Sequence, residues 1–138
     1  MYKLVVVGHG NFPSGVLSSV SLLVGENENI IGLDLDANET HEGFENKLKE
    51  ILDNNDKVIV LADLTGGAPH QIAARLILES SKLNQYIISG INLALVVDLA
   101  MKCCLGEVED EDIQSELSNS INESKDTTVL ISNRMMSK

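Results

Sequence analysis

Aromatic residues are scarce in this sequence, and tryptophan is absent altogether. Only 3% of its 138 residues are aromatic, although 43% are hydrophobic. The core must therefore be built from valine, isoleucine, leucine and alanine, which are typical of parallel β-sheets covered by helices on both faces. A chain of this length fits one domain and can bury enough surface to fold without a disulfide or a metal ion.

Basic residues are also few. Ten lysines and arginines stand against 21 aspartates and glutamates, which gives a formal net charge of −11. This balance excludes a general electrostatic affinity for nucleic acid or anionic membranes, because such binding needs clustered positive charge. We expect no nucleic-acid partner. Negative charge favours solubility, and it also suits docking to partners whose surfaces are basic.

Cysteine is limited to one adjacent pair, Cys103 and Cys104. Neighbouring cysteines seldom form a disulfide of ordinary geometry, and no cysteine or histidine spacing indicates a metal site. Free thiols in an apolar helix are typical of the reducing cytosol. The first apolar run, residues 4–7, is too short for a signal peptide or a membrane span. The sequence therefore predicts a cytoplasmic protein without a cofactor or a metal ion.

Short apolar runs alternate along the chain with segments of helical periodicity. Residues such as Pro13, Gly25 and Thr40 (or Asn38) mark where helices begin or end. The pattern predicts one α/β domain over residues 1–138, with an open, mostly parallel sheet between helices on both faces. We adopt the flavodoxin-like strand order 2-1-3-4. Strands are predicted at residues 4–7, 30–35, 58–62, 86–89 and 127–132, and helices begin near residues 13, 40, 69, 92 and 113.

The first and third predicted strands both end in residues that can carry chemistry. The first ends in the sequence GHG at residues 8–10, and the third is followed by Asp63. These strands are neighbours in the flavodoxin-like order, and open α/β sheets bind ligands beyond the carboxyl ends of their strands. A carboxylate that accepts one ring N–H of His9 fixes the tautomer, leaves the other nitrogen as a nucleophile and stabilises developing positive charge. We therefore predict that His9 and Asp63 form a catalytic pair.

A glycine-containing turn follows Asp63 and leads into a helix that starts near Pro69. Backbone N–H groups that no side chain covers, together with the partial positive charge of a helix start, form a binding site for anions. A threonine hydroxyl adds another donor. The sequence predicts a phosphoryl-binding turn opposite His9, made of Thr65, Gly66, Gly67 and Ala68.

Each of these features also has an ordinary structural explanation. A lone histidine after a strand is often a loop residue, Asp63 is a suitable helix N-cap, and paired glycines occur in many tight turns. His41 and His70 begin helices and are interpreted as surface or capping residues, although His70 is close enough in sequence to line the same rim. Only the coincidence of three features at one rim favours the functional interpretation.

These motifs, in this order, resemble the enzyme IIA domain of the mannose family of the bacterial sugar phosphotransferase system. The matching segments are VVVGHG at residues 5–10 with Gly15 downstream, VLADLTGGAP at residues 60–69 and SGINL at residues 89–93. Two positions depart from the common pattern. Ala68 stands where serine is frequent, which removes one hydroxyl contact to phosphate, and Thr65 replaces a bulky apolar or aromatic residue.

The resemblance implies that His9 accepts a phosphoryl group from the phosphocarrier HPr and passes it to a IIB component. The membrane IIC/IID pair would then take up the sugar that IIB phosphorylates. Asp63 would orient His9, and residues 65–68 would surround the phosphoryl oxygens. The resemblance also implies a homodimer in which an antiparallel last strand, residues 127–132, is exchanged between subunits. A free-standing IIA component is expected, since the sequence ends without a linker.

Two other functions remain open at the level of sequence. The first is the phosphotransfer subunit of a dihydroxyacetone kinase, which uses a histidine at the end of its first strand. The second is a non-catalytic, flavodoxin-like regulatory module that never receives phosphate. The glycine turn and the segment at residues 90–92 favour the sugar-transport interpretation.

Overall fold

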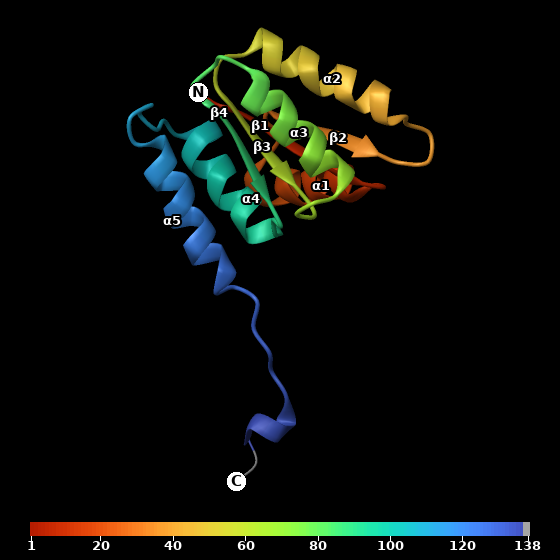
Figure 1. Cartoon of the computed structure of the whole chain (residues 1–138). Coiled ribbons are helices and arrows are strands. Elements are labelled where there is room, and N and C mark those ends of the chain that lie inside the picture. The colour runs from red at the N-terminus through yellow and green to blue at the C-terminus, as the bar shows by residue number, and fades with distance from the viewer. Residues whose placement is uncertain (137–138) are drawn as a thin grey trace.

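Four parallel strands form the centre of the molecule in the order β2-β1-β3-β4, as predicted. The computed structural model describes residues 1–136, and Figure 1 shows their arrangement. The two central strands, β1 and β3, consist mainly of β-branched and leucine side chains, which suit a fully covered sheet. The strands are β1 (Lys3–His9), β2 (Ile30–Leu35), β3 (Val58–Ala62) and β4 (Gln85–Ser89).

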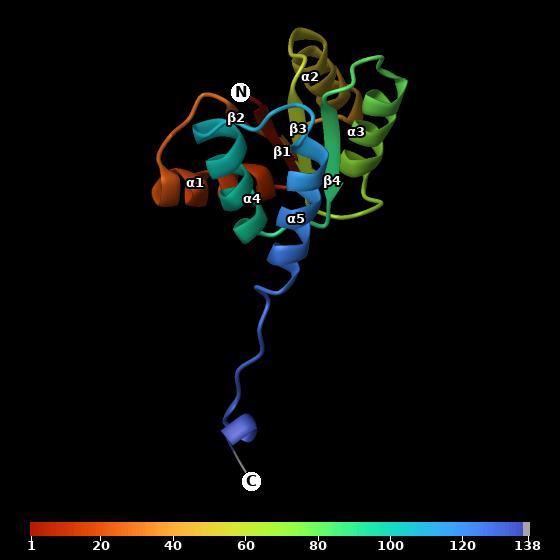
Figure 2. The same ribbon diagram turned by 90° about the vertical axis from the view of Figure 1, so that its left-hand side faces the viewer.

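Helices cover both faces of this sheet. The helices α1 (Phe12–Val24), α4 (Leu93–Leu99) and α5 (Ile113–Lys125) lie on one face, and α2 (His41–Asn54) and α3 (Ala68–Glu79) lie on the other (Figures 1 and 2). Within the part of the chain that is described, no helix is long and apolar enough to cross a membrane.

Alternate side chains of β1 enter the two separate cores. Leu4 and Val6 pack among residues of α1, α4 and α5, whereas Val5 and Val7 pack against α2 and α3. All four side chains are fully buried. This alternation follows from the two-residue period of a strand, and it fixes the register that carries His9 to the carboxyl end of the sheet.

The predicted helix boundaries are largely confirmed. Thr40 caps α2 by accepting the Gly43 backbone N–H at 2.9 Å, and Gly25 ends α1 with φ of 88°. The helix predicted to begin near residue 92 is α-helical only as far as Leu99. It then continues as a π-helical segment, η1 (Ala100–Leu105), which buries the free thiols of Cys103 and Cys104.

No strand forms at residues 127–132, and all four strands of the described sheet are parallel, so the expected antiparallel last strand is not confirmed. Figures 1 and 2 show that a C-terminal tail, residues 127–136, leaves the body after α5 and extends away from it. Its apolar side chains are exposed, with Val129 at 72%, Leu130 at 78% and Ile131 at 86%. A short apolar run of this kind forms a strand only where a neighbouring strand supplies hydrogen bonds. The tail has no such neighbour among residues 1–136.

Candidate active site at the carboxyl rim of the sheet

Strands β1 and β3 end side by side, and this brings together the two residues that the sequence singled out. Val7 is paired with Ala62 in the parallel register, and the Asp63 N–H donates to the Val7 carbonyl at 3.2 Å. His9 and Asp63 therefore leave adjacent strands at the same rim, as predicted. The reversal of strand order occurs at this point, where open α/β sheets bind ligands.

The Asp63 carboxylate holds His9 by two hydrogen bonds. Its Oδ2 accepts from the His9 backbone N–H at 2.8 Å and lies 2.9 Å from Nδ1 of the ring. Because a carboxylate can only accept, Nδ1 carries the ring proton and Nε2 is the nitrogen with a lone pair. The approach requires glycine at position 8, since a Cβ at Gly8 would lie 2.8 Å from Cγ of Asp63.

The two side chains differ sharply in exposure. Asp63 is 9% exposed, whereas His9 is 46% exposed and can be reached from solvent. Burial raises the pKa of Asp63, but hydrogen bonds from the His9 backbone, the His9 ring and the Leu64 N–H outweigh it, so the pKa lies below its usual value. The carboxylate is thus charged at neutral pH and can balance a positive imidazole.

The lowered pKa of Asp63 predicts an acid dependence of folding stability. The stabilisation is fully present above the ordinary aspartate pKa of about 3.9 and is lost as the pH falls toward the lower value of the folded state. We expect Asp63→Asn to remove this contribution, so that its free energy of unfolding falls less steeply than that of wild type below about pH 4. Urea unfolding at several pH values measures the two slopes. Parallel slopes would show that Asp63 gains nothing from its contacts with His9.

The glycine turn after Asp63 lies against the His9 ring. A Cβ added at Gly67 would be 2.7 Å from Cε1 of His9 and 3.4 Å from Nε2. Gly67 is the N-cap of α3, and Pro69 occupies the first turn of that helix. The backbone N–H groups of Ala68 and His70, also in the first turn, have no acceptor among residues 1–136. Nε2 of His9 therefore lies close to Gly67 and to a helix N-terminus with unused donors, an arrangement that favours a bound anion.

One member of the predicted phosphoryl-binding turn has its N–H already occupied. The Gly66 N–H donates to Nδ1 of His70 at 2.8 Å, and Nε2 of Gln71 donates to the Gly66 carbonyl at 2.5 Å. Of the four residues predicted, Gly66 thus contributes its left-handed conformation, with φ of 87°, rather than a donor. The sequence analysis placed His70 near this rim but predicted no contact for it. His70 is the third residue after the N-cap, and a side chain at that position often accepts a hydrogen bond from the backbone at the start of the helix. This position is the signal that could have identified the contact.

Thr65 has a partner that sequence reasoning missed. Its Oγ1 and the Oγ of Ser89, at the end of β4, share a hydrogen bond at 2.7 Å. Gly90 follows Ser89 with φ of 71°, and a Cβ there would lie 3.4 Å from Oγ1 of Thr65. The threonine hydroxyl therefore ties the turn to β4. The signal for this contact was the position of Ser89 at the end of the strand next to β3.

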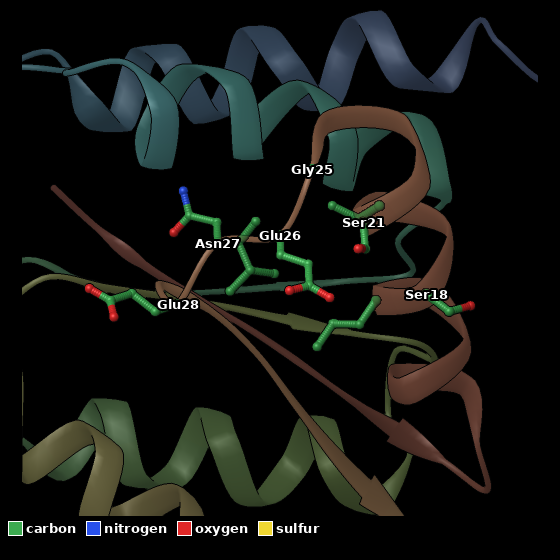
Figure 3. A pocket seen from close by; sticks show the side chains of 9 residues that line it. Ser18, Ser21, Gly25, Glu26, Asn27 and Glu28 are labelled. Atoms are coloured by element: carbon green, nitrogen blue, oxygen red, sulfur yellow. The ribbon is translucent and has the colours of Figure 1, made fainter.

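The site is an open surface rather than an enclosed cavity. A cavity of about 690 Å³ lies elsewhere, between the end of α1 and the start of β2 (Figure 3), and neither His9 nor Asp63 lines it. In the region from Met1 to Met136, no group of three histidine, cysteine, aspartate or glutamate side chains is arranged to hold a metal ion. An exposed, oriented histidine of this kind is accessible to a group carried by another protein.

The fold and the rim geometry define a flavodoxin-like α/β protein with a carboxylate-oriented histidine at the point where strand order reverses. The family described as the fructose IIA component of the phosphotransferase system (PTS) matches residues 3–123. This chain belongs to that family and is a PTS IIA component of the fructose/mannose type.

Individual relatives agree with this assignment. The chain is 28% identical over 103 residues to the PTS fructose-specific EIIA component of Bacillus subtilis (strain 168), covering 72% of this chain and 68% of that protein. It is 30% identical over 101 residues to the mannose-specific EIIAB component of Escherichia coli (strain K12), covering 70% of this chain and 31% of that protein. The crystal structure of the phosphotransferase component EIIA from Streptococcus agalactiae has a TM-score of 0.82 and 28% identity, and the match covers 94% of this chain and 97% of that one.

Proposed function

We propose that His9 is the phosphoryl carrier of this IIA component, which receives the group from HPr and passes it to a IIB component during sugar uptake. The observation that carries the proposal is the hydrogen bond between Nδ1 of His9 and Asp63, which leaves Nε2 exposed as the nucleophile. Residues 1–138 act in this proposal as one IIA domain in the cytoplasm, where its protein partners carry the phosphoryl group.

The transfer step needs only groups that the site supplies. The lone pair on Nε2 of His9 forms the new P–N bond, while the P–N bond to the histidine of HPr breaks and its electron pair returns to that ring. The proton on Nδ1 stays in place, and Asp63 balances the positive charge of the phosphorylated imidazole. The N-terminus of α3 stabilises the phosphoryl oxygens as they move. Transfer to IIB is the same step, with this histidine as the leaving group.

The surface around His9 suits docking of a protein. Phe12 and Leu64 follow His9 and Asp63 closely in sequence and are 36% and 60% exposed, so apolar area borders the nucleophile. The net charge of −11 favours partners with basic surfaces, such as we propose for HPr and IIB. Steering of this kind accelerates association and is weakened by salt. A rate of transfer from HPr that is insensitive to salt would contradict this electrostatic part of the proposal.

Reconstitution tests the carrier function directly. The protein is incubated with phosphoenolpyruvate, enzyme I and HPr, and its intact mass is measured before and after. We expect one added phosphoryl group that is stable in base and labile in acid, as phosphohistidine is. The phosphorylated protein is then incubated, in separate reactions, with a IIB component and with a dihydroxyacetone kinase subunit. Transfer to the kinase alone would favour that second function, and no labelling would favour a non-catalytic module.

We also propose that the chain forms a homodimer through its C-terminal tail. The β4 strand pairs with β3 on one side only, so its outer edge presents unpaired backbone groups. The tail presents the exposed apolar side chains of Val129, Leu130 and Ile131. Antiparallel addition of the tail to β4 of a second copy satisfies both surfaces at once.

Proline substitution tests this exchange. Leu130→Pro removes a backbone donor and blocks strand pairing, whereas Leu130→Thr keeps a residue that favours strands. We expect wild type and Leu130→Thr to sediment as dimers and Leu130→Pro to shift toward monomer at the same concentration. Sedimentation velocity makes the comparison. A wild-type protein that stays monomeric at high concentration would contradict the exchange.

A further inference from the structure

The turn that touches the His9 ring is held by side chains of α3. The Gly67 N–H donates to the Leu64 carbonyl at 3.4 Å, which closes a turn of four residues, 64–67. Gly66 is the third residue of this turn and has φ of 87°. This is the pattern of a type II β-turn, which requires a positive φ at that position. The peptide group between Thr65 and Gly66 is the central one of the turn, and its orientation distinguishes type II from type I.

Two polar contacts fix the peptide groups on either side of Gly66. His70 accepts the Gly66 N–H through Nδ1 at 2.8 Å, which fixes the Thr65–Gly66 peptide. Gln71 donates Nε2–H to the Gly66 carbonyl at 2.5 Å, which fixes the peptide that follows. Both side chains come from the first turn of α3, so the helix start and the turn behave as one unit.

Apolar packing does not replace these contacts. Gly66 is exposed, and a Cβ built on it would meet no atom within 4 Å. Glycine is also the residue with the fewest steric limits on its backbone, so its own conformational preference does not select one orientation of the turn. The Thr65–Ser89 hydrogen bond ties the turn to β4, but the orientation of the peptide groups on either side of Gly66, and with it the position of Gly67, depends on the hydrogen bonds that hold Gly66.

We propose that His70 is a positioning residue of the phosphoryl-transfer site, which acts by accepting the Gly66 N–H and so keeps Gly67 and the N-terminus of α3 against His9. The inference rests on the proposed carrier function, and it assigns to His70 the role of a hydrogen-bond acceptor. His70 does not bind the phosphoryl group in this account. It maintains the turn in the orientation that keeps Gly67 against the His9 ring, next to the unused N–H groups of Ala68 and His70 in the first turn of α3.

An acceptor deletion and its rescue test this role. His70→Leu removes the acceptor but keeps a side chain of similar bulk, and His70→Gln supplies an amide oxygen that commonly accepts at this helix position. We expect His70→Leu to lower kcat for transfer from HPr by about ten- to a hundredfold with little change in KM, because misplacement of the catalytic groups has effects of this size. His70→Gln should restore most of the rate. His41→Leu, at the exposed start of α2, controls for loss of a histidine.

Amide hydrogen exchange supplies a readout that is independent of transfer. We expect the Gly66 amide to be protected in wild type and His70→Gln, and to exchange faster in His70→Leu. A wild-type kcat in His70→Leu, or a His70→Gln variant as slow as His70→Leu, would overturn the inference. Failure of the wild-type protein to accept phosphate would instead refute the proposed carrier function. An unprotected Gly66 amide in wild type would refute the contact with His70, whether or not the protein accepts phosphate.

Discussion

The His9→Ala variant is expected to accept no phosphoryl group from HPr, with no residual transfer above background. The substitution removes Nε2, the ring nitrogen that carries a lone pair, and leaves Asp63 without the group that it orients. The α3 N-terminus and the turn remain, but they supply only donors and cannot form a bond to phosphorus. Folding should be preserved, because the side chain is 46% exposed and no core contact depends on it. Intact mass after reconstitution measures the outcome.

His41→Ala is the matched control for this experiment. His41 is exposed at the first position of α2, whose helix does not contribute to the rim around His9. We expect this variant to be labelled at the wild-type rate. Labelling of His9→Ala would show that another group carries the phosphate. A base-labile product would identify an aspartyl phosphate, and Asp63 would then be the first residue to replace.

The site was predictable where local signals and strand order were sufficient. A buried apolar run ends at the same position in β1 and β3, and the flavodoxin-like order makes these strands neighbours. Those two facts place His9 beside Asp63 without any knowledge of side-chain contacts. The turn was equally visible, because a glycine pair followed by proline indicates a tight connection into a helix.

Other features depended on interactions that the sequence pattern does not encode. The tail has the composition of a strand, yet it extends away from the body and pairs with no strand edge within residues 1–136. The use of the Gly66 N–H by His70 depends on a rotamer of one side chain, which periodicity cannot reveal. The π-helical segment after Leu99 is so short that its apolar pattern does not differ from that of an α-helix, so the sequence could not distinguish the two.

The Gly67→Ala variant is expected to slow transfer by about a hundredfold while the protein remains folded. The backbone at Gly67 has φ of −70° and ψ of 164°, which alanine adopts without strain. The added Cβ would nevertheless lie 2.7 Å from Cε1 of His9. Because His9 is half exposed, its ring can rotate toward solvent to relieve the overlap, and the bond from Nδ1 to Asp63 is lost. A misplaced nucleophile loses a rate factor of about 10².

The Gly106→Ala variant is the control, in which stability rather than the rate of transfer is expected to change. Gly106 also has a negative φ, of −105°. A Cβ added there would lie 3.2 Å from the carbonyl oxygens of Met101 and Lys102, and these backbone atoms cannot rotate away. Gly106 ends η1, and the Cys103 carbonyl of that segment accepts the Tyr2 N–H at the amino end of β1, whereas His9 lies at the carboxyl end. We expect the variant to lose about 1 kcal/mol of stability and to transfer phosphate normally.

Thermal unfolding and the rate of transfer from HPr, measured on both variants, separate the two effects. The Cε1–H resonance of His9 should shift in Gly67→Ala and remain in place in Gly106→Ala, because only the first change displaces the ring. A Gly67→Ala protein with a displaced ring and an undiminished rate would mean that the orientation imposed by Asp63 is not needed for transfer. A protein in which the ring has not moved would mean that the turn yields instead, and the reduced rate should then be reproduced by His70→Leu.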